Sequence, residues 1–171
     1  MPAASEALPG ALYVVATPIG HRDDITVRAL NVLRRVDCIA AEDTRLTGRL
    51  LAHYGISARE LRSHHEHNEE ATFPRLLARL AAGDRVALVS DAGTPGLSDP
   101  GAVLVRAARA VGIAVLPVAG PSALAAALSV AGLTETDFYF GGFPAAKKKE
   151  RRTQFAVLKQ LSCPLIFYEA P

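Results

Sequence analysis

The sequence is poor in cysteine and in long apolar runs, and each shortage narrows what the protein can be. Only two of its 171 residues are cysteines, Cys38 and Cys163, and neither belongs to a Cys-x-x-Cys pair. Both lie in apolar runs, which predicts reduced thiols in the core of a cytosolic protein rather than disulfides. No apolar run approaches the roughly 18 residues that span a bilayer, so no membrane contact is expected.

The charges are nearly balanced as well. Lys and Arg number 19 and Asp and Glu 17, which leaves a formal net charge of +2. This balance does not indicate a protein that binds nucleic acid over its whole surface, so any RNA contact must come from a local patch. Half of the residues are hydrophobic, which is enough to bury a core. Residues 1–10 carry no basic segment, which argues against a signal peptide and favours a cytoplasmic location.

Short apolar runs alternate with segments of helical spacing along the first two thirds of the chain. Pro74 suggests that the regular part of one helix begins nearer Phe73, and Asp99 followed by Pro100 suits the cap and first position of another. The alternation predicts an α/β fold with a mainly parallel sheet, in which ligands bind beyond the carboxyl ends of the strands. The predicted strands are 11–17, 36–41, 61–65, 85–90 and 113–118, and the predicted helices are 26–35, 45–54, 69–82 and 100–111.

The texture changes after Gly120, where an alanine-rich segment begins. We therefore predict two domains, 1–119 and 120–171. The second is expected to be an incomplete α/β domain, because the sequence stops directly behind a strand with a buried pattern. Its predicted elements are a helix at 121–131, a strand at 138–140, a helix at 149–161 and a strand at 165–168.

The most informative segment is residues 90–101, SDAGTPGLSDPG, between a strand and a helix. Gly93, Gly96 and Gly101 permit positive φ and a close approach of backbone to a ligand. The segment lacks the Gly-Lys-Ser/Thr end of a P-loop and does not match G-x-G-x-x-G. It indicates a ligand-binding loop, although a well-made turn is the alternative.

Three polar segments remain open to two interpretations each. Residues 42–45, EDTR, suit chemistry on a hydroxyl group, or a helix start with a salt-bridged arginine. His65 and His67 would share the face of a strand, but no third ligand is suitably spaced, so we expect no metal there and an exposed polar loop that is either solvated or faces a substrate. Residues 147–152, KKKERR, form a phosphate-contacting patch or a solvated helix start. Several of the aromatic residues just before it, at 138–140 and 143, are expected in the core.

Together these segments resemble the ribosomal RNA small-subunit methyltransferase I family, within the tetrapyrrole (corrin/porphyrin) methylase superfamily. The combination of SDAGTPGLSDPG with AEDTR resembles that family in particular. Two positions depart from the family pattern. His21 stands where Asn is usual, and Phe143 is followed directly by Pro144, whereas the family commonly has Leu-Pro after GGF. The matching motifs are VATPIG at 15–20, AEDTR at 41–45, HEHNE at 65–69, SDAGTPGLSDPG at 90–101, GPSAL at 120–124 and GGF at 141–143.

The resemblance implies a tetrapyrrole-methylase-like enzyme of two α/β domains, usually a homodimer, that binds S-adenosylmethionine in the cleft between its domains. The implied reaction is 2′-O-methylation of a cytidine in 16S ribosomal RNA of the 30S subunit. The basic patch would then contact RNA. By motif position, the cofactor is expected to meet Pro18, Asp91, Gly93, Thr94, Ser122 and Ala123. The implied RNA contacts are Lys147, Lys148, Lys149, Arg151 and Arg152.

The implied chemistry needs no metal, because a sulfonium methyl is already activated and the enzyme must mainly align a nucleophile with it. A ribose hydroxyl is a weak acid, so a base should help. Asp43 and Glu42 are the candidates, with Arg45 orienting a phosphate or the carboxylate. The alternatives are a tetrapyrrole methyltransferase of the same superfamily and an inactive, truncated fragment that only folds and dimerises.

Overall fold

The computed structural model describes residues 8–134 and 136–169, and it divides the chain into two compact units, 1–123 and 124–171. Residues 1–7, which belong to the segment without a signal-peptide pattern, and residues 170–171 lie outside the described part. Each unit is described by itself. In the described part, no helix is both long enough and apolar enough to cross a membrane.

Unit 1 is built on a five-stranded sheet with the order β3-β2-β4-β1-β5, in which every neighbouring pair is parallel. The α/β fold with a parallel sheet is therefore confirmed. The strands are β1 (Leu12–Val15), β2 (Cys38–Ala41), β3 (Leu61–Ser63), β4 (Val86–Val89) and β5 (Val115–Val118). The helices are α1 (Val27–Arg35), α2 (Thr44–His53), α3 (Glu69–Ala81) and α4 (Ala102–Ala110), with a 3-10 turn, η1 (Arg22–Asp24).

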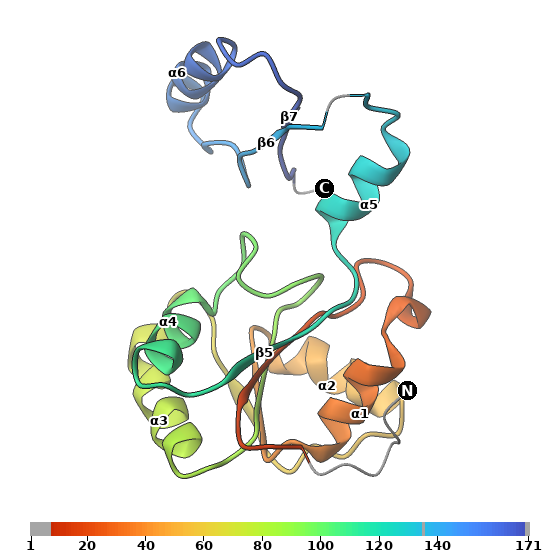
Figure 1. The fold of residues 1–171 in the computed structure, drawn as a ribbon, viewed down its shortest axis with the longest axis vertical. Helices are drawn as coiled ribbons and strands as arrows, with labels where there is room; N and C mark the ends of the chain where they lie inside the picture. The colour runs from red at the N-terminus through yellow and green to blue at the C-terminus, as the bar shows by residue number, and fades with distance from the viewer. Residues whose placement is uncertain (1–7, 135, 170–171) are drawn as a thin grey trace. The chain divides into compact units, whose positions relative to one another are not determined.

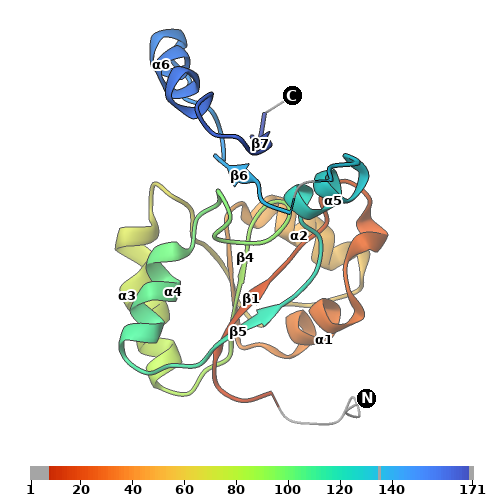
Figure 2. The ribbon, with the colours of Figure 1, turned by 45° about the horizontal axis from the view of Figure 1, so that its top comes forward.

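Helices cover both faces of this sheet, because alternate residues of each strand point to opposite sides. Tyr13 and Ile39 pack on the face covered by α1 and α2, whereas Leu12 and Leu88 pack under α3 and α4. Figures 1 and 2 show the two helix pairs on opposite sides of the strands. Both cysteines are predicted to lie in the core. Cys38 is fully buried on the face covered by α3 and α4, whereas Cys163 is partly exposed, so the prediction is wrong for Cys163.

The first turns of two helices differ from the sequence predictions. Helix α3 starts at Glu69, as the predicted range does, but it is regular from that residue and not only from near Phe73, because the Asn68 carbonyl accepts backbone bonds of the first turn before Pro74 is reached. Helix α4 is capped by Gly101, at φ 115°, instead of by Asp99. A Cβ at position 101 would lie 2.5 Å from a methyl carbon of Leu88, so the tight packing selects glycine there.

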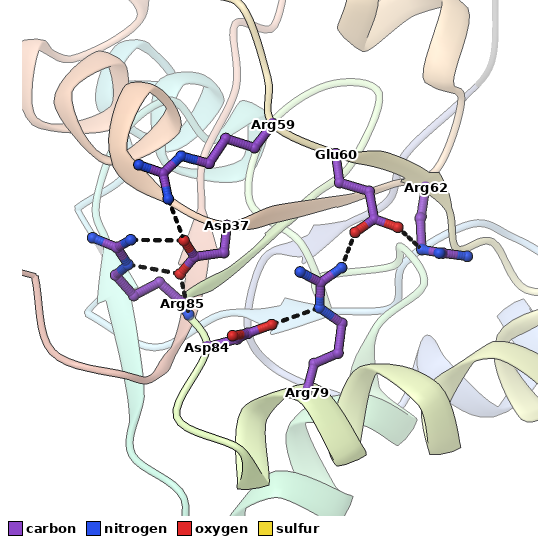
Figure 3. Close-up of polar contacts among 7 residues, drawn as sticks. All are labelled: Asp37, Arg59, Glu60, Arg62, Arg79, Asp84 and Arg85. Atoms are coloured by element: carbon purple, nitrogen blue, oxygen red, sulfur yellow. Dashed lines mark hydrogen bonds and ion pairs between the residues drawn. The ribbon is translucent and has the colours of Figure 1, made fainter.

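Ion pairs join the segments in which β2, β3 and β4 begin, at the amino-terminal edge of the sheet (Figure 3). Asp37 accepts hydrogen bonds from Arg85 at 2.7 Å and from Arg59 at 2.8 Å. Glu60 pairs with Arg62 and Arg79, and Arg79 also binds Asp84 at 2.7 Å. Hydrogen bonds from Arg85 hold the pKa of Asp37 well below its usual range. The network joins strand starts that are distant in sequence.

Unit 2 is smaller and more open. Helix α5 (Ala123–Val130) leads into it. Strand β6 (Tyr139–Phe140) pairs in parallel with β7 (Leu165–Ile166), and helix α6 (Lys148–Leu158) lies between these two strands in the sequence. None of its described residues is fully buried. Phe138 and Phe143 are 43% and 54% exposed, and Tyr139 and Phe140 are half-buried. The prediction that several of these aromatic residues lie in the core is therefore wrong for the described structure of this unit.

Candidate functional site

The loops that follow β1, β2 and β4 meet at the carboxyl-terminal edge of the sheet. Strand β4 lies between β2 and β1. Helix α4, which follows β4, packs on one face, while α1 and α2, which follow β1 and β2, pack on the other. Neighbouring strands whose connections leave to opposite faces open a crevice at their carboxyl ends, and open α/β sheets bind ligands there. The 90–101 loop occupies this position.

A backbone pairing joins the loops after β1 and β4. The N–H of Thr17 donates to the carbonyl of Gly93 at 2.9 Å, and the N–H of Gly93 donates to the carbonyl of Thr17 at 3.0 Å. The buried hydroxyl of Thr17 donates to the Ser90 carbonyl at 3.1 Å. Gly93 has φ 82°, a conformation that strains any residue with a Cβ. These bonds fix the backbone of both loops.

Asp91 joins the loop after β4 to the loop after β2. Its backbone N–H donates to Oε2 of Glu42 at 3.1 Å, and its own carboxylate accepts the backbone N–H of Asp43 at 2.9 Å. Asp43 then caps α2 by accepting the N–H of Arg45 at 2.7 Å, and it holds the Arg45 guanidinium at 2.7 and 3.1 Å. Three acids and one arginine are therefore positioned by backbone bonds as well as by charge.

Two cavities lie beside this Glu42–Asp91–Asp43 bridge. One has a volume of about 300 Å³, and its lining includes Thr17, Pro18, Arg22, Arg49, Ser90 and Asp91. The other, of about 280 Å³, lies between the loop after β2 and the end of β3, and we call it the His65 recess. Its lining residues are Glu42, Asp43, Thr44, Arg45, Ser63 and His65.

Comparison with known proteins gives this fold and site a family. Residues 11–171 match the family Tetrapyrrole (Corrin/Porphyrin) Methylases. The chain belongs to that family. It is also similar to a solved structure, uroporphyrin-III-C-methyltransferase from Thermus thermophilus, with a TM-score of 0.57 and 26% identity over 81% of this chain and 64% of that one.

Three curated relatives of this tetrapyrrole methylase share the name ribosomal RNA small subunit methyltransferase I. The Xylella fastidiosa protein is 56% identical over 95% of this chain, the Pseudomonas aeruginosa protein 54% over 95%, and the Escherichia coli O157:H7 protein 53% over 94%. The resemblance stated from the motifs is confirmed. The chain spans 59%, 57% and 56% of the length of these three relatives.

The two adjacent acids of this methylase chain have opposite electrostatic environments. Burial raises the pKa of Glu42, and the neighbouring carboxylates of Asp91 and Asp99 raise it further. Hydrogen bonds from Arg45 hold the pKa of Asp43 well below its usual range. Burial also raises the pKa of Asp99, although a hydrogen bond from Ser90 opposes it. Glu42 therefore binds a proton more readily than Asp43, whose carboxylate is held as an anion by Arg45.

The residues expected to meet a cofactor lie along the loops of unit 1. Pro18 and Asp91 line the larger cavity. A Cβ on Gly93 would lie 3.4 Å from Ile19 and 3.9 Å from the carbonyl oxygen of Pro121. The Thr94 hydroxyl donates to that carbonyl at 3.1 Å, which brings the 90–101 loop next to the Gly120–Ala123 turn. Ser122 and Ala123 follow Pro121 at the start of α5.

Residues 64–69 are exposed only in part, so the prediction that this whole segment is exposed needs correction. His64 is fully buried and its Nδ1 lies 2.7 Å from the Thr72 hydroxyl. Asn68 accepts the backbone N–H of His65 at 2.8 Å, and Glu69 accepts the N–H of Gly101 at 3.3 Å. His67 is exposed, as expected. The segment therefore connects the end of β3 to the start of α4.

The basic segment lies at the start of α6. Lys147 pairs with Glu150 at 3.2 Å, whereas the Arg151 guanidinium donates to the carbonyls of Ala145 and Ala146 at 3.1 Å each. Lys148, Lys149 and Arg152 are exposed. Within the described residues, no three His, Cys, Asp or Glu side chains are gathered as metal ligands would be.

Sequence reasoning missed several residues that line the site. Asp99, predicted as a helix cap, is a partly buried acid beside Ser90 and Asp91. Arg22 and Arg49 belong to no motif and reach the larger cavity only through the fold. Ser63 and His65 enter the recess because β3 pairs with β2. Thr17, Asp99 and His65 lie inside the motifs VATPIG, SDAGTPGLSDPG and HEHNE and so carried a local signal, whereas Ser63, Arg22 and Arg49 carried none.

The opposite environments predict opposite effects on stability. Burial raises the pKa of Glu42 in the folded protein, so ionisation of Glu42 lowers the free energy of unfolding. This loss of stability is absent below the pKa of Glu42 in the unfolded chain, about 4.3, and is complete above the pKa in the folded protein. Glu42→Gln keeps the acceptor for the Asp91 N–H and should raise the melting temperature at neutral pH. Asp43→Asn should lower it, because an acid with a depressed pKa stabilises the fold above its unfolded pKa of about 3.9.

Thermal denaturation at about pH 7 and about pH 3.5 would measure both effects, and both differences should shrink at the lower pH. Glu70→Gln, at an exposed acid on α3, provides the matched control. A destabilised Glu42→Gln variant at neutral pH would show that the Glu42 charge supports the fold, contrary to the environment described here.

Proposed function

We propose that the protein is an S-adenosylmethionine-dependent methyltransferase that acts on RNA of the small ribosomal subunit, with the 2′-hydroxyl of a cytidine in 16S ribosomal RNA as acceptor. The observation that carries the proposal is the Glu42–Asp91–Asp43 bridge at the ligand-binding edge of the sheet. It supports the proposal because the Glu42 carboxylate lies beside the loops of a methylase fold, where the proposed reaction needs a base. The shared name of the curated relatives supports RNA as the substrate.

The residues at this edge fit the chemistry of the cofactor. S-adenosylmethionine carries a positive sulfonium and a positive ammonium group, and the edge presents the carboxylates of Glu42, Asp43, Asp91 and Asp99. Gly93 lets backbone approach a ligand without a side chain in the way. The proposed cofactor contacts are Pro18, Asp91, Gly93, Thr94, Ser122 and Ala123.

The proposed mechanism gives each side chain a separate task. When bound, S-adenosylmethionine supplies a methyl group that is already activated for transfer. Glu42, with Oε2 held by the Asp91 N–H, accepts the ribose hydroxyl proton on its carboxylate. Asp43 keeps Arg45 in position, and the exposed guanidinium then orients an RNA phosphate. Glu42 is preferred as base because its raised pKa is closer to neutrality, while Asp43 is already engaged with Arg45.

The basic segment supports RNA as the acceptor. Lys147, Lys148, Lys149, Arg151 and Arg152 lie at the positive end of the α6 dipole, where cations destabilise a helix and anions stabilise it. An RNA backbone would relieve this repulsion. The homodimer and the cytoplasmic location implied by the family resemblance belong to the same proposal.

A tetrapyrrole acceptor is the second candidate, favoured by the likeness to uroporphyrin-III-C-methyltransferase. Methyl transfer from labelled S-adenosylmethionine separates the two. The protein expressed from its natural reading frame should label 30S subunits, with the label recovered in 2′-O-methylcytidine, and should leave uroporphyrinogen III unlabelled. Label in the porphyrinogen, or in no acceptor, would overturn the proposal.

The RNA patch has a test of its own. Replacing Lys147, Lys148 and Lys149 by Ala should weaken RNA binding and reduce the slope of log affinity against log salt by up to about 0.7 to 0.9 for each phosphate that is no longer neutralised. Cofactor affinity should be unchanged. A control that removes the same charge from exposed positions of unit 1, at Arg75, Arg106 and Arg109, should keep the wild-type slope. Equal slopes in all three proteins would make the segment solvated surface.

A further inference from the structure

We infer that the His65 recess receives the nucleoside that is methylated, and that His65 contacts it directly. This inference rests on the proposed function and adds a substrate subsite and a recognition residue to it.

The recess is placed where an acceptor hydroxyl must arrive. Glu42 and Asp43 form one wall, and Ser63 and His65 form the other. The pairing of β2 with β3 sets these walls, since Ala41 lies opposite Ser63 and the His64 N–H donates to the Ala41 carbonyl at 2.7 Å. A nucleoside that presents its ribose to Glu42 from this side has its remaining groups beside Ser63 and His65.

His65 carries hydrogen-bonding capacity that the described protein does not use. Its Nδ1 is buried, and within the described residues it has no hydrogen-bond partner. Buried polar atoms are nearly always paired, so an unpaired one at the wall of a cavity points to a ligand or a bound water. The cavity is polar and open, with a carboxylate on its opposite wall. The imidazole is therefore suited to hydrogen-bond a base or sugar.

Hydrogen bonds made by Asn68, which does not line the recess, hold His65 in position. Oδ1 of Asn68 accepts the His65 backbone N–H at 2.8 Å, and Nδ2 of Asn68 donates to the Ser63 hydroxyl at 3.2 Å. The His67 ring contacts the His65 ring edge to face, with the centroids 5.9 Å apart. A recognition group gains affinity when its backbone is held before the ligand binds. Asn68 supplies that support without entering the recess.

The other charges of the recess complete a set that suits one nucleotide. Arg45 uses Nε and Nη2 on Asp43, yet its side chain is 85% exposed, so the guanidinium remains available to a phosphate. The recess thus offers a cation for the phosphate, a carboxylate for the ribose hydroxyl and an imidazole for the base. Its volume of about 280 Å³ lies at the small end of ligand pockets and suits one nucleoside better than a tetrapyrrole macrocycle.

The experiment compares His65→Ala, His65→Asn and wild type in methyl transfer to 30S subunits. His65→Ala should lower kcat/KM for the subunit by about tenfold or more, while the Kd for S-adenosylmethionine stays within about twofold of wild type. His65→Asn should recover most of the loss, because its side-chain amide lies close to the position of the unpaired imidazole Nδ1. His53→Ala, at an exposed histidine that ends α2, is the matched control and should behave as wild type.

A His65→Ala variant with wild-type kcat/KM would overturn the inference. A parallel loss of cofactor affinity would do the same, since the recess would then be part of the cofactor site or of the fold. So would a His65→Asn variant as poor as His65→Ala. These results differ from failure of the proposed function, in which the wild-type protein itself transfers no methyl group to the subunit.

Discussion

The position of β4 between β2 and β1 is the constraint on which the candidate site depends. Because the helices that follow these strands leave to opposite faces, the 90–101 loop cannot be covered by a helix and stays open at the sheet edge. Thr17 holds one side of that loop through a reciprocal backbone pair, and Asp91 ties the other side to Glu42 and Asp43. The ion pairs of Asp37 and Glu60 fasten the far edge of the same sheet, so the strand ends stay in register.

Adjacent acids in one sequence motif have separate roles because their surroundings differ. Glu42 loses solvent at the end of β2 and faces other carboxylates, whereas Asp43 turns outward to cap α2 and to bind Arg45. Although Glu42 and Asp43 are adjacent, the negative charge of Glu42 therefore destabilises the fold, and that of Asp43 stabilises it. Sites that carry such destabilising charges are common where function requires them.

The order of strands and helices in unit 1 could be predicted from sequence because apolar runs and helical spacing are local signals. The regular helix before Phe73 and the cap of α4 at Gly101 could not, since one depends on the Asn68 carbonyl and the other on the side chain of Leu88. The buried state of His64 was also hidden, because it comes from packing between the end of β3 and α3. The same holds for the His65 recess, whose walls come from two separate segments. Loop motifs located the site, and tertiary contacts decided the role of each residue.

The central claim is that Glu42, held by the Asp91 N–H, is the base of the methyl transfer and that Asp43 is not. The most direct measurement is the pH dependence of kcat/KM for transfer to 30S subunits by wild type, Glu42→Gln and Asp43→Asn. Loss of a general base typically costs about 10² to 10⁴ in rate, so Glu42→Gln should fall by that order and lose the acidic limb of the wild-type profile. Asp43→Asn should keep the limb and lose less than Glu42→Gln, because it disturbs only the position of Arg45. A profile in which Glu42→Gln keeps the limb while Asp43→Asn loses it would contradict the account.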